Sequence, residues 1–205
     1  MKHGRDPLAL GLSTRQLEQL QGFANLLQTW GPKLGLIGSG DRDRIWERHI
    51  LDSLRAIECV PRGVASLVDV GSGPGLPGIP VAIALPAARM VLLEPKRRRA
   101  AFMELAVEEL SLRNVSVVTS PASAVHETFQ VVMARALAPV DQTWSLAGHL
   151  VAPGGVLLYF AGASWIEAER GLSVEGVTVS ECFPSRLESE GPIVMIRRGE
   201  GSRTP

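Results

Sequence analysis

The chain is poor in cysteine, in aromatic residues and in net charge, and it contains no long hydrophobic run. Lys plus Arg and Asp plus Glu both number 21, so the formal net charge is zero. A uniformly basic surface for nucleic acid is therefore excluded, whereas a local basic patch is not. The apolar stretches are short, and Arg135 interrupts the stretch from Val131 to Val140, so we expect no membrane-spanning segment.

Only two cysteines are present, Cys59 and Cys182. They lie far apart and neither has a CxxC partner, so we expect buried, reduced thiols and neither a disulfide nor a zinc site. The residues from Met1 to Pro7 lead into no apolar run of the kind that forms a signal peptide. The sequence therefore predicts a cytoplasmic protein.

What the sequence does have is a 45% share of hydrophobic residues over 205 positions, enough for the core of one ordinary domain. From Ser13 to Trp30 the apolar residues recur at steps of three and four. Because Ser13 or Thr14 can cap the N-terminus, this pattern predicts an amphipathic helix, which we expect Gly31-Pro32 to end. A second helical segment is expected from about Arg42 to Val60.

After residue 60 the pattern changes to short apolar runs that alternate with helical stretches. Strands are predicted at 67–70, 90–93, 115–118, 131–134 and 156–160, helices at 77–85 and 97–110, and a final hairpin at 177–179 and 193–196. This alternation is typical of an α/β fold, a mostly parallel sheet with helices on both faces. We therefore expect an N-terminal helical extension over 1–62, a Rossmann-like domain with a seven-stranded sheet over 63–198, and a disordered tail over 199–205.

A glycine-rich segment follows the first predicted strand. Gly71, Gly73 and Gly75 come directly after Val70, and a predicted helix begins at Pro77. Glycine lets the chain turn sharply and lets a ligand approach the backbone without a Cβ in the way. We also expect free N–H groups at the start of the helix, which can face a polar ligand. This strand–turn–helix unit predicts a nucleotide cofactor against the turn.

The spacing around the turn indicates which cofactor. Glu94 ends the next predicted strand, 23 positions beyond Gly71, where this class of fold holds the ribose hydroxyls. A dinucleotide fingerprint needs a glycine at position 76, which here is Leu76, and the turn is preceded by Asp69. A site lined by carboxylate and backbone suits a cationic sulfonium with an amino-acid tail. The sequence therefore predicts S-adenosylmethionine as cofactor and disfavours an NAD-dependent oxidoreductase.

The segment from Val68 to Pro80 resembles the long signature of the RsmG family, also called glucose-inhibited division protein B. Its end, Pro77-Gly78-Ile79-Pro80, is unusual among methyltransferases and is the most specific part. Three further segments are similar to family segments in order and spacing: Arg48–Leu54, Leu92–Arg98 and Met133–Ala136. The resemblance covers about Leu17 to Gly162. It implies a class I methyltransferase that methylates N7 of a guanine in 16S rRNA, with the small ribosomal subunit or its assembly intermediate as partner.

The resemblance also assigns residues to the site. It implies cofactor contacts at Gly71, Leu76, Glu94, Ala122, Ser123 and Arg135, and substrate-facing, catalytic roles for Arg135, His49 and Asp52. From the residues alone, Arg135 is either such a group or the partner of Asp69 or Asp52, because an unpaired arginine is costly to bury. His49 and Asp52 have the alternative of a core histidine and a solvated ion-pair face that Arg48 and Arg55 share. Guanine N7 has an exposed lone pair, so positioning suffices without a general base.

A basic run, Lys96, Arg97 and Arg98, stands at the start of a predicted helix, where cations oppose the helix dipole. We expect these residues, together with Arg48, to contact RNA phosphates, the alternative being a solvated face. No set of residues has metal-ligand spacing, so no metal is expected, and we expect a monomer.

The chain departs from the family at three places. Pro121-Ala122-Ser123, Phe160-Ala161-Gly162 and Gly35-Leu36-Ile37 stand where the family has Arg-Ala-Glu, Lys-Gly and Asn-Leu-Thr. An acidic contact to the adenine and a basic group near the RNA are therefore missing. Two alternatives remain open: a methyltransferase for another RNA or a small molecule, and a cofactor-binding assembly factor with little turnover.

Overall fold

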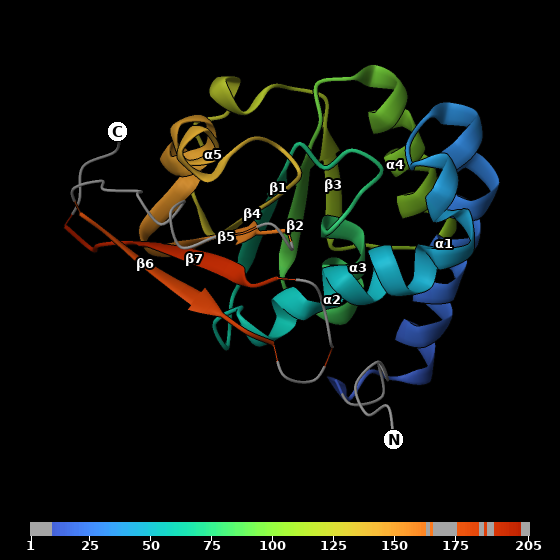
Figure 1. The fold of residues 1–205 in the computed structure, drawn as a ribbon, viewed down its shortest axis with the longest axis horizontal. Helices are drawn as coiled ribbons and strands as arrows, with labels where there is room; N and C mark the ends of the chain where they lie inside the picture. Colours follow the sequence, from blue (N-terminus) through green and yellow to red (C-terminus); the bar gives the residue numbers. More distant parts are fainter. Residues whose placement is uncertain (1–9, 163–164, 166–175, 185–186, 188–190, 202–205) are drawn as a thin grey trace.

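A seven-stranded sheet forms the centre of the molecule in the computed structural model, which describes residues 10–162, 165, 176–184, 187 and 191–201 (Figure 1). The strands are β1 (Ser66–Val70), β2 (Arg89–Leu93), β3 (Val115–Val118), β4 (Phe129–Arg135), β5 (Val151–Phe160), β6 (Val177–Cys182) and β7 (Ile193–Arg198). Their order is β3-β2-β1-β4-β5-β7-β6. The first five strands are parallel, and β7 is antiparallel to both β5 and β6. The predicted mixed sheet with a hairpin at one edge is confirmed.

The central strands are buried on both faces, which is why they read as continuous apolar runs. In β4, the four residues from Val131 to Ala134 are all fully buried. Alternate residues enter two separate cores, one on each face of the sheet. Helices cover both faces, so the class I Rossmann-like architecture is confirmed.

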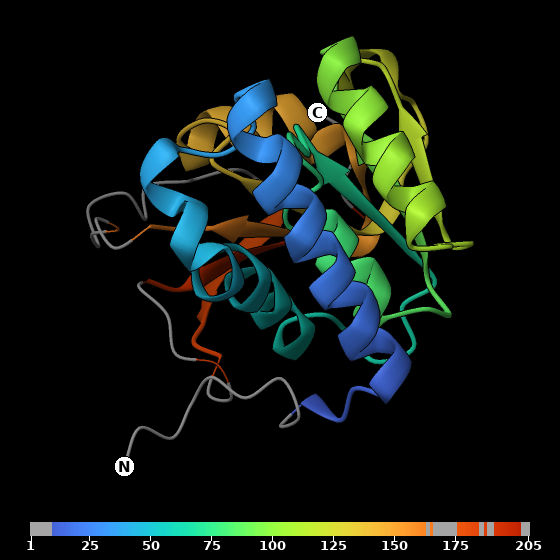
Figure 2. The ribbon, with the colours of Figure 1, turned by 90° about the vertical axis from the view of Figure 1, so that its right-hand side faces the viewer.

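The helices are α1 (Thr14–Leu34), α2 (Asp52–Leu54), α3 (Gly78–Ala84), α4 (Arg97–Glu109) and α5 (Val140–Ala147). Helices α1, α3 and α4 contribute to the larger core, and α5 covers the opposite face. Figure 2 shows α1 lying across α3 and beside α4. Gln16 of α1 donates to the carbonyl of Ile83 at 2.8 Å and Gln19 donates to that of Leu110 at 2.8 Å. The N-terminal helix is therefore fastened to the sheet's own helices.

Helix α1 begins as predicted and ends later than predicted. Ser13 caps it in a reciprocal capping box with Gln16. The helix continues through Gly31-Pro32 to Leu34, and Gly35, with φ of 62°, ends it. The glycine of the Gly-Pro pair is needed for packing, because a Cβ on Gly31 would lie 2.7 Å from a side-chain carbon of Ile37. The expected stop at Gly31-Pro32 is therefore wrong.

The second helical segment is wound irregularly instead of forming one helix. It consists of the 3-10 helix Ser39–Arg44, the π-helical turn Trp46–Leu51, α2 and the 3-10 helix Arg55–Glu58. These changes of winding rotate the inward-facing side, so that Ser53, Leu54, Arg55 and Ala56 are all buried. The interpretation that placed Arg55 on a solvated ion-pair face is therefore wrong.

Cys59 and Cys182 form a disulfide. They are 123 positions apart in the sequence, yet their Cα atoms are 6.3 Å apart. The expectation of reduced thiols is wrong because the antiparallel hairpin brings the end of β6 beside the end of the second helical segment. Spacing along the chain contains no sign of this proximity.

At the C-terminal end, Arg198 belongs to β7 and its buried guanidinium donates to the carbonyl of Val151 at 2.8 Å. Of the predicted tail, residues 199–201 are described, and residues 202–205 lie outside the described part. Within the described ranges, the helices are all too short or too polar to cross a bilayer.

Candidate functional site

The glycine turn lies at the carboxyl end of β1, where ligands of open α/β sheets bind. Gly71, Gly73 and Gly75 have φ values of 70°, 57° and 91°, a region that side chains with a Cβ rarely adopt. Gly78 is needed for a different reason, since a Cβ there would lie 2.3 Å from a methyl carbon of Leu92. The four glycines therefore meet both backbone and packing requirements.

The N–H groups of the turn are used inside the protein. Those of Gly71 and Ser72 donate to the carbonyl of Leu93 at 2.9 and 3.0 Å, and that of Gly73 donates to the Glu94 carboxylate at 3.0 Å. Those of Gly75 and Leu76 donate to the carbonyl of Ser72 at 2.8 and 3.0 Å. At the start of α3 the N–H groups of Gly78 and Ile79 are also paired, with Asp69 and with the carbonyl of Gly75, so the expectation of free donors there is wrong. A phosphate would find no donor among these groups.

Two carbonyl oxygens of the turn are free to accept a hydrogen bond from a ligand. Among the described residues, none donates a hydrogen bond to the carbonyls of Gly71 and Gly73. Carbonyl oxygens attract cations and repel phosphates. The turn consequently suits a ligand with a positively charged group and an amino-acid tail.

Asp69 is buried beneath the turn. One carboxylate oxygen accepts the N–H of Gly78 at 2.9 Å, which ties the start of α3 to β1. The other oxygen, Oδ1, has no partner within the described residues. Burial raises the pKa of Asp69 to about 7, although the hydrogen bond from Gly78 opposes the shift. Asp69 therefore joins the two ends of the turn, the end of β1 and the start of α3.

Glu94, also buried, joins the turn to the next strand. Its Oε2 accepts the N–H of Gly73 at 3.0 Å, its Oε1 accepts that of Lys96 at 2.9 Å, and the Arg99 guanidinium lies 3.6 Å from Oε2. Each carboxylate oxygen has more than one lone pair. Glu94 can therefore accept further hydrogen bonds from ribose hydroxyls while it holds the turn.

Ala122 and Ser123 lie in the 3-10 helix Ala122–Ala124, after β3. In the sequence, His149 has no partner at metal-ligand spacing. In the structure it holds this segment. Its Nε2 lies 3.1 Å from the carbonyl oxygen of Ala122 and 3.2 Å from that of Val125. Sequence reasoning missed this support because the contact joins positions 27 and 24 residues apart.

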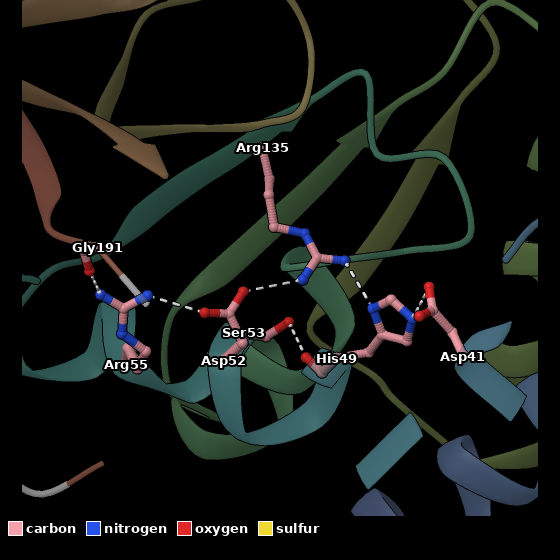
Figure 3. Close-up of polar contacts among 7 residues, drawn as sticks. All are labelled: Asp41, His49, Asp52, Ser53, Arg55, Arg135 and Gly191. Atoms are coloured by element: carbon pink, nitrogen blue, oxygen red, sulfur yellow. Dashed lines mark hydrogen bonds and ion pairs between the residues drawn. The ribbon is translucent and has the colours of Figure 1, made fainter. Parts of the chain in front are cut away.

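A second group of polar side chains, which we call the arginine cluster, consists of Asp41, His49, Asp52, Arg55 and Arg135 (Figure 3). Arg135 stands at the end of β4 and points toward the irregular helical segment. Its Nη1 donates to Asp52 Oδ2 at 3.1 Å, and its Nη2 lies 3.4 Å from His49 Nδ1. The structure thus brings together the three residues with expected catalytic roles, and it selects Asp52 as the carboxylate partner of Arg135.

The contacts of His49 favour its neutral form. Arginine can only donate, so Nδ1 must be the accepting nitrogen and the proton must be on Nε2. That nitrogen lies 3.4 Å from Asp41 Oδ2 without completing a hydrogen bond to any described group. Burial lowers the pKa of His49, and the charge of Arg135 lowers it further.

Arg55 lies on the inner side of the arginine cluster. Its Nη1 donates to Asp52 Oδ1 at 2.8 Å, and its Nη2 donates to the carbonyl of Gly191, which precedes β7. Two arginines therefore share the Asp52 carboxylate, one on each oxygen. The sequence signal for Arg55 was a helical spacing of three from Asp52, which indicated an ion pair but not its burial.

The candidate RNA-binding residues are at the surface. Arg48 is exposed and pairs with Asp41 at 3.1 Å. Lys96, Arg97 and Arg98 are exposed at the start of α4, and Arg98 reaches the carbonyl of Lys33 at 3.3 Å. Lys33, at the end of α1, therefore extends the basic run. The sequence did not indicate this because the two segments are 65 positions apart.

A cavity of about 360 Å³ opens at the carboxyl ends of β4 and β5. Its lining consists of loop residues and two aromatic side chains: Ala136, Leu137, Ala138, Pro139, Tyr159, Gly162 and Trp165. Leu137 also covers the turn, since a Cβ on Gly71 would lie 2.7 Å from it. The cavity is therefore next to the glycine turn. The described part of the chain contains no group of three or more residues that could hold a metal ion.

With this geometry in view, the chain was compared with known proteins. A family model described as rRNA small subunit methyltransferase G (GidB) matches residues 16–188. A ribosomal RNA small subunit methyltransferase G of Acidiphilium cryptum (strain JF-5) is 38% identical over 180 residues, which is 86% of this chain and 82% of the relative. The protein of that name from Frankia alni (strain DSM 45986 / CECT 9034 / ACN14a) is 39% identical over 202 residues, covering 92% and 77%.

Solved structures share the fold at low identity. A ribosomal protein L11 methylase from Lactobacillus delbrueckii subsp. bulgaricus has a TM-score of 0.56 at 14% identity, covering 80% of this chain and 81% of that one. A mutant of MtNAS in complex with S-adenosylmethionine has a TM-score of 0.54 at 18% identity, covering 90% and 72%. At these identities the likeness concerns the fold alone.

Proposed function

The chain belongs to the family of rRNA small subunit methyltransferases G, and from this premise we propose that it transfers a methyl group from S-adenosylmethionine to N7 of a guanine in 16S rRNA. The observation in the structure that carries the proposal is the glycine turn, in which the N–H groups are paired and two carbonyls are open. We propose the 16S rRNA or the small ribosomal subunit as partner, and a monomer that acts in the cytoplasm, where that substrate is.

The residues around the turn fit this cofactor. The open carbonyls of Gly71 and Gly73 would face its ammonium group, and Glu94 would accept its ribose hydroxyls. Asp69 and Gly75 would keep the turn in shape from below. The remaining contacts, to the adenine end and the methionine end, would come from Leu76, Ala122, Ser123 and Arg135. When bound, the cofactor supplies an electrophilic methyl carbon on a sulfonium.

The reaction makes modest chemical demands on the chain. Guanine N7 presents a lone pair and no proton, so it would take the methyl carbon directly, and the electron pair of the carbon–sulfur bond would stay on sulfur. No proton has to be removed, so His49 and Asp52 need not act as bases. Their role in this proposal is to hold Arg135, whose guanidinium orients the nucleotide through hydrogen bonds. Catalysis is then mostly positioning.

The cavity beside the turn is our candidate for the guanine. Its volume of about 360 Å³ is within the range of small-molecule sites. A base in a paired region would have to leave the stack to reach it. Contacts to the surrounding RNA would come from Arg48, Lys96, Arg97 and Arg98, which bind phosphates without reading sequence. Since the net charge is zero, a folded subunit with a complementary shape is a better partner than free RNA.

The test is methyl transfer from tritiated S-adenosylmethionine to small subunits purified from cells that lack this gene. We expect label in one guanine, at which the RNA chain becomes cleavable by aniline after borohydride reduction, as N7-methylguanosine does. Subunits from cells with the gene serve as a control and should take up no label. Label at another position or in a small molecule would support a different methyltransferase. Cofactor binding without any transfer would support an assembly factor.

A further inference from the structure

Arg55 is the largest fully buried side chain of the described residues, with 2% of its surface exposed. A buried guanidinium needs partners, because its desolvation is otherwise uncompensated. Within the described residues, its partners are a carboxylate oxygen of Asp52 and the carbonyl of Gly191, and its buried Nε has none. The resemblance assigns no function to position 55.

The Asp52 carboxylate is held between Arg55 and Arg135. A carboxylate that faces one arginine tends to place both oxygens on that guanidinium. Here Arg135 binds one oxygen at 3.1 Å and Arg55 binds the other at 2.8 Å, from opposite sides (Figure 3). The Arg55 contact therefore sets the rotation of the Asp52 carboxylate and, through it, the place of Arg135.

We infer that Arg55 is a positioning residue for methyl transfer: it holds Asp52 so that Asp52 orients Arg135 toward the nucleotide. This inference rests on the proposed function and adds to it a residue that does not itself contact substrate or cofactor. The reference point for the arrangement is the C-terminal hairpin, since Gly191 lies just before β7.

The hairpin position is itself well determined. A Cβ at Gly191, where φ is 110°, would lie 2.6 Å from the carbonyl oxygen of Gly162, so the backbone there is pressed against the end of β5. In the sheet, Arg135 is paired with Phe160, Phe160 with Ile193, and Ile193 with Cys182. One row across four strands thus leads from Arg135 to the disulfide.

The disulfide closes this row into a ring. Cys182 is bonded to Cys59, which lies four positions after Arg55 on the irregular helical segment. From there, Arg55 and Asp52 lead back to Arg135 through two ion pairs. Arg55 therefore links the sheet to the site. Its contact with Gly191 holds it to the hairpin, and its contact with Asp52 holds the carboxylate that binds Arg135.

His49 provides a reporter of this arrangement. Burial lowers the pKa of His49 most, the charges of Arg135 and Arg48 lower it further, and those of Asp41 and Asp52 raise it, whereas Arg55 is not among the causes of the shift. Without Arg55, both oxygens of Asp52 can turn to Arg135 and neutralise it more completely. The pKa of His49 should then rise toward 6.5, and this change can be measured by proton NMR without any turnover.

The experiment compares five variants with wild type. Arg55→Met removes the charge and keeps an apolar side chain in the space, and Arg55→Lys keeps the charge on a single nitrogen in place of the planar fork that reaches both partners. Arg89→Met is the matched control, because Arg89 forms an exposed ion pair with Glu127. Asp52→Asn alone and Asp52→Asn combined with Arg55→Met complete a double-mutant cycle. The measurements are kcat and KM with unmethylated small subunits, the Kd of the cofactor, and the His49 titration.

For Arg55→Met we expect kcat to fall about tenfold, the cofactor Kd to stay within about twofold, and the His49 pKa to rise. The kcat of Arg55→Lys should fall about threefold, and that of Arg89→Met should not change. Since both residues act through one contact, Asp52→Asn should lower kcat no more than about twofold further in the Arg55→Met background.

Three results would overturn the inference: an unchanged His49 titration in Arg55→Met, a lower melting temperature of that variant with unchanged kcat, or effects of Arg55→Met and Asp52→Asn that multiply fully. If Arg55→Met does not fold, Arg55→Lys decides, and an unchanged kcat together with an unchanged His49 pKa there contradicts us. An inactive wild type would instead refute the proposed function, while the titration would still test the arrangement.

Discussion

The glycine turn and the arginine cluster lie near one another, and they are built in opposite ways. The turn and most of the residues that hold it lie within ten consecutive positions, 69–78, and backbone N–H groups make the contacts, most of them within the segment or to the end of β2. The arginine cluster draws residues from the irregular helical segment and from β4, and charged side chains hold it. A backbone site suits a cofactor that is always the same, whereas a side-chain cluster can be adjusted to a particular substrate.

The two regions also differ in their exposure to solvent. Asp69 and Glu94 are both buried at the turn. In the arginine cluster, the side chains of His49, Arg135 and Asp52 are 12%, 18% and 27% exposed, and only Arg55 is sealed. The cluster therefore remains accessible to a substrate. Perturbing each region should separate binding of the cofactor from turnover.

The largest effect is expected from removing the disulfide, which fastens the side of the arginine cluster and not the turn. On the chain-entropy treatment, a crosslink between residues 123 apart stabilises the fold by about 5 kcal/mol. We expect the Cys59→Ser, Cys182→Ser double variant to show this loss in urea unfolding, with an unchanged cofactor Kd in the folded protein. Wild type in a dithiol reductant should match it. A loss of cofactor affinity would contradict the separation of the two regions.

Gly78→Ala should damage the turn. The new Cβ would meet Leu92 at 2.3 Å and the Asp69 carboxylate at 2.8 Å, so we expect about 3 kcal/mol of destabilisation and weaker cofactor binding. Gly40→Ala is the control, because nothing lies within 4 Å of a Cβ there. Calorimetry measures the stability of the two variants, and cofactor titration measures their affinity for the cofactor. Equal effects of the two substitutions would argue against a packing requirement at Gly78.

Arg135→Ala should give the reverse pattern, with turnover lost and stability kept. In the proposed mechanism this guanidinium orients the nucleotide, and misplacement of this kind costs about 100-fold in rate. Single-turnover methylation of small subunits measures the loss. Arg62→Ala, at an exposed position outside both regions, should stay at the wild-type rate. A full rate in Arg135→Ala would remove the arginine cluster from the mechanism.

The smallest effect concerns pH. The folded-state pKa of His49 lies below 6.5, so its neutral form contributes stability that is complete above pH 6.5 and is lost as the pH falls through the lowered pKa. Protonation also ends the acceptance of the Arg135 hydrogen bond. We expect kcat to decline severalfold below that pKa, and His49→Asn to lack this decline. If wild type and His49→Asn show the same decline of kcat at low pH, the decline belongs to another group.

Much of the fold and the turn could be predicted because their signals are local. Apolar runs at 67–70 and 131–134 match β1 and β4, and a strand followed by Gly71, Gly73 and Gly75 leaves few conformations to choose from. The ends of elements were harder. The stop expected at Gly31-Pro32 failed because the helix ends only at Gly35, whose left-handed φ of 62° and backbone N–H cap the last turn.

By itself, the sequence determined the sheet, the turn and the family, since each depends on periodicity or on residues close together in the chain. Only the tertiary structure decided that Cys59 bonds Cys182, that Arg55 is buried, and that Gly191 receives its guanidinium. The physical reason is that a charge in a helical pattern reads as solvated until a distant segment covers it. Here a hairpin more than 120 positions away supplies both the cover and the hydrogen-bond acceptor.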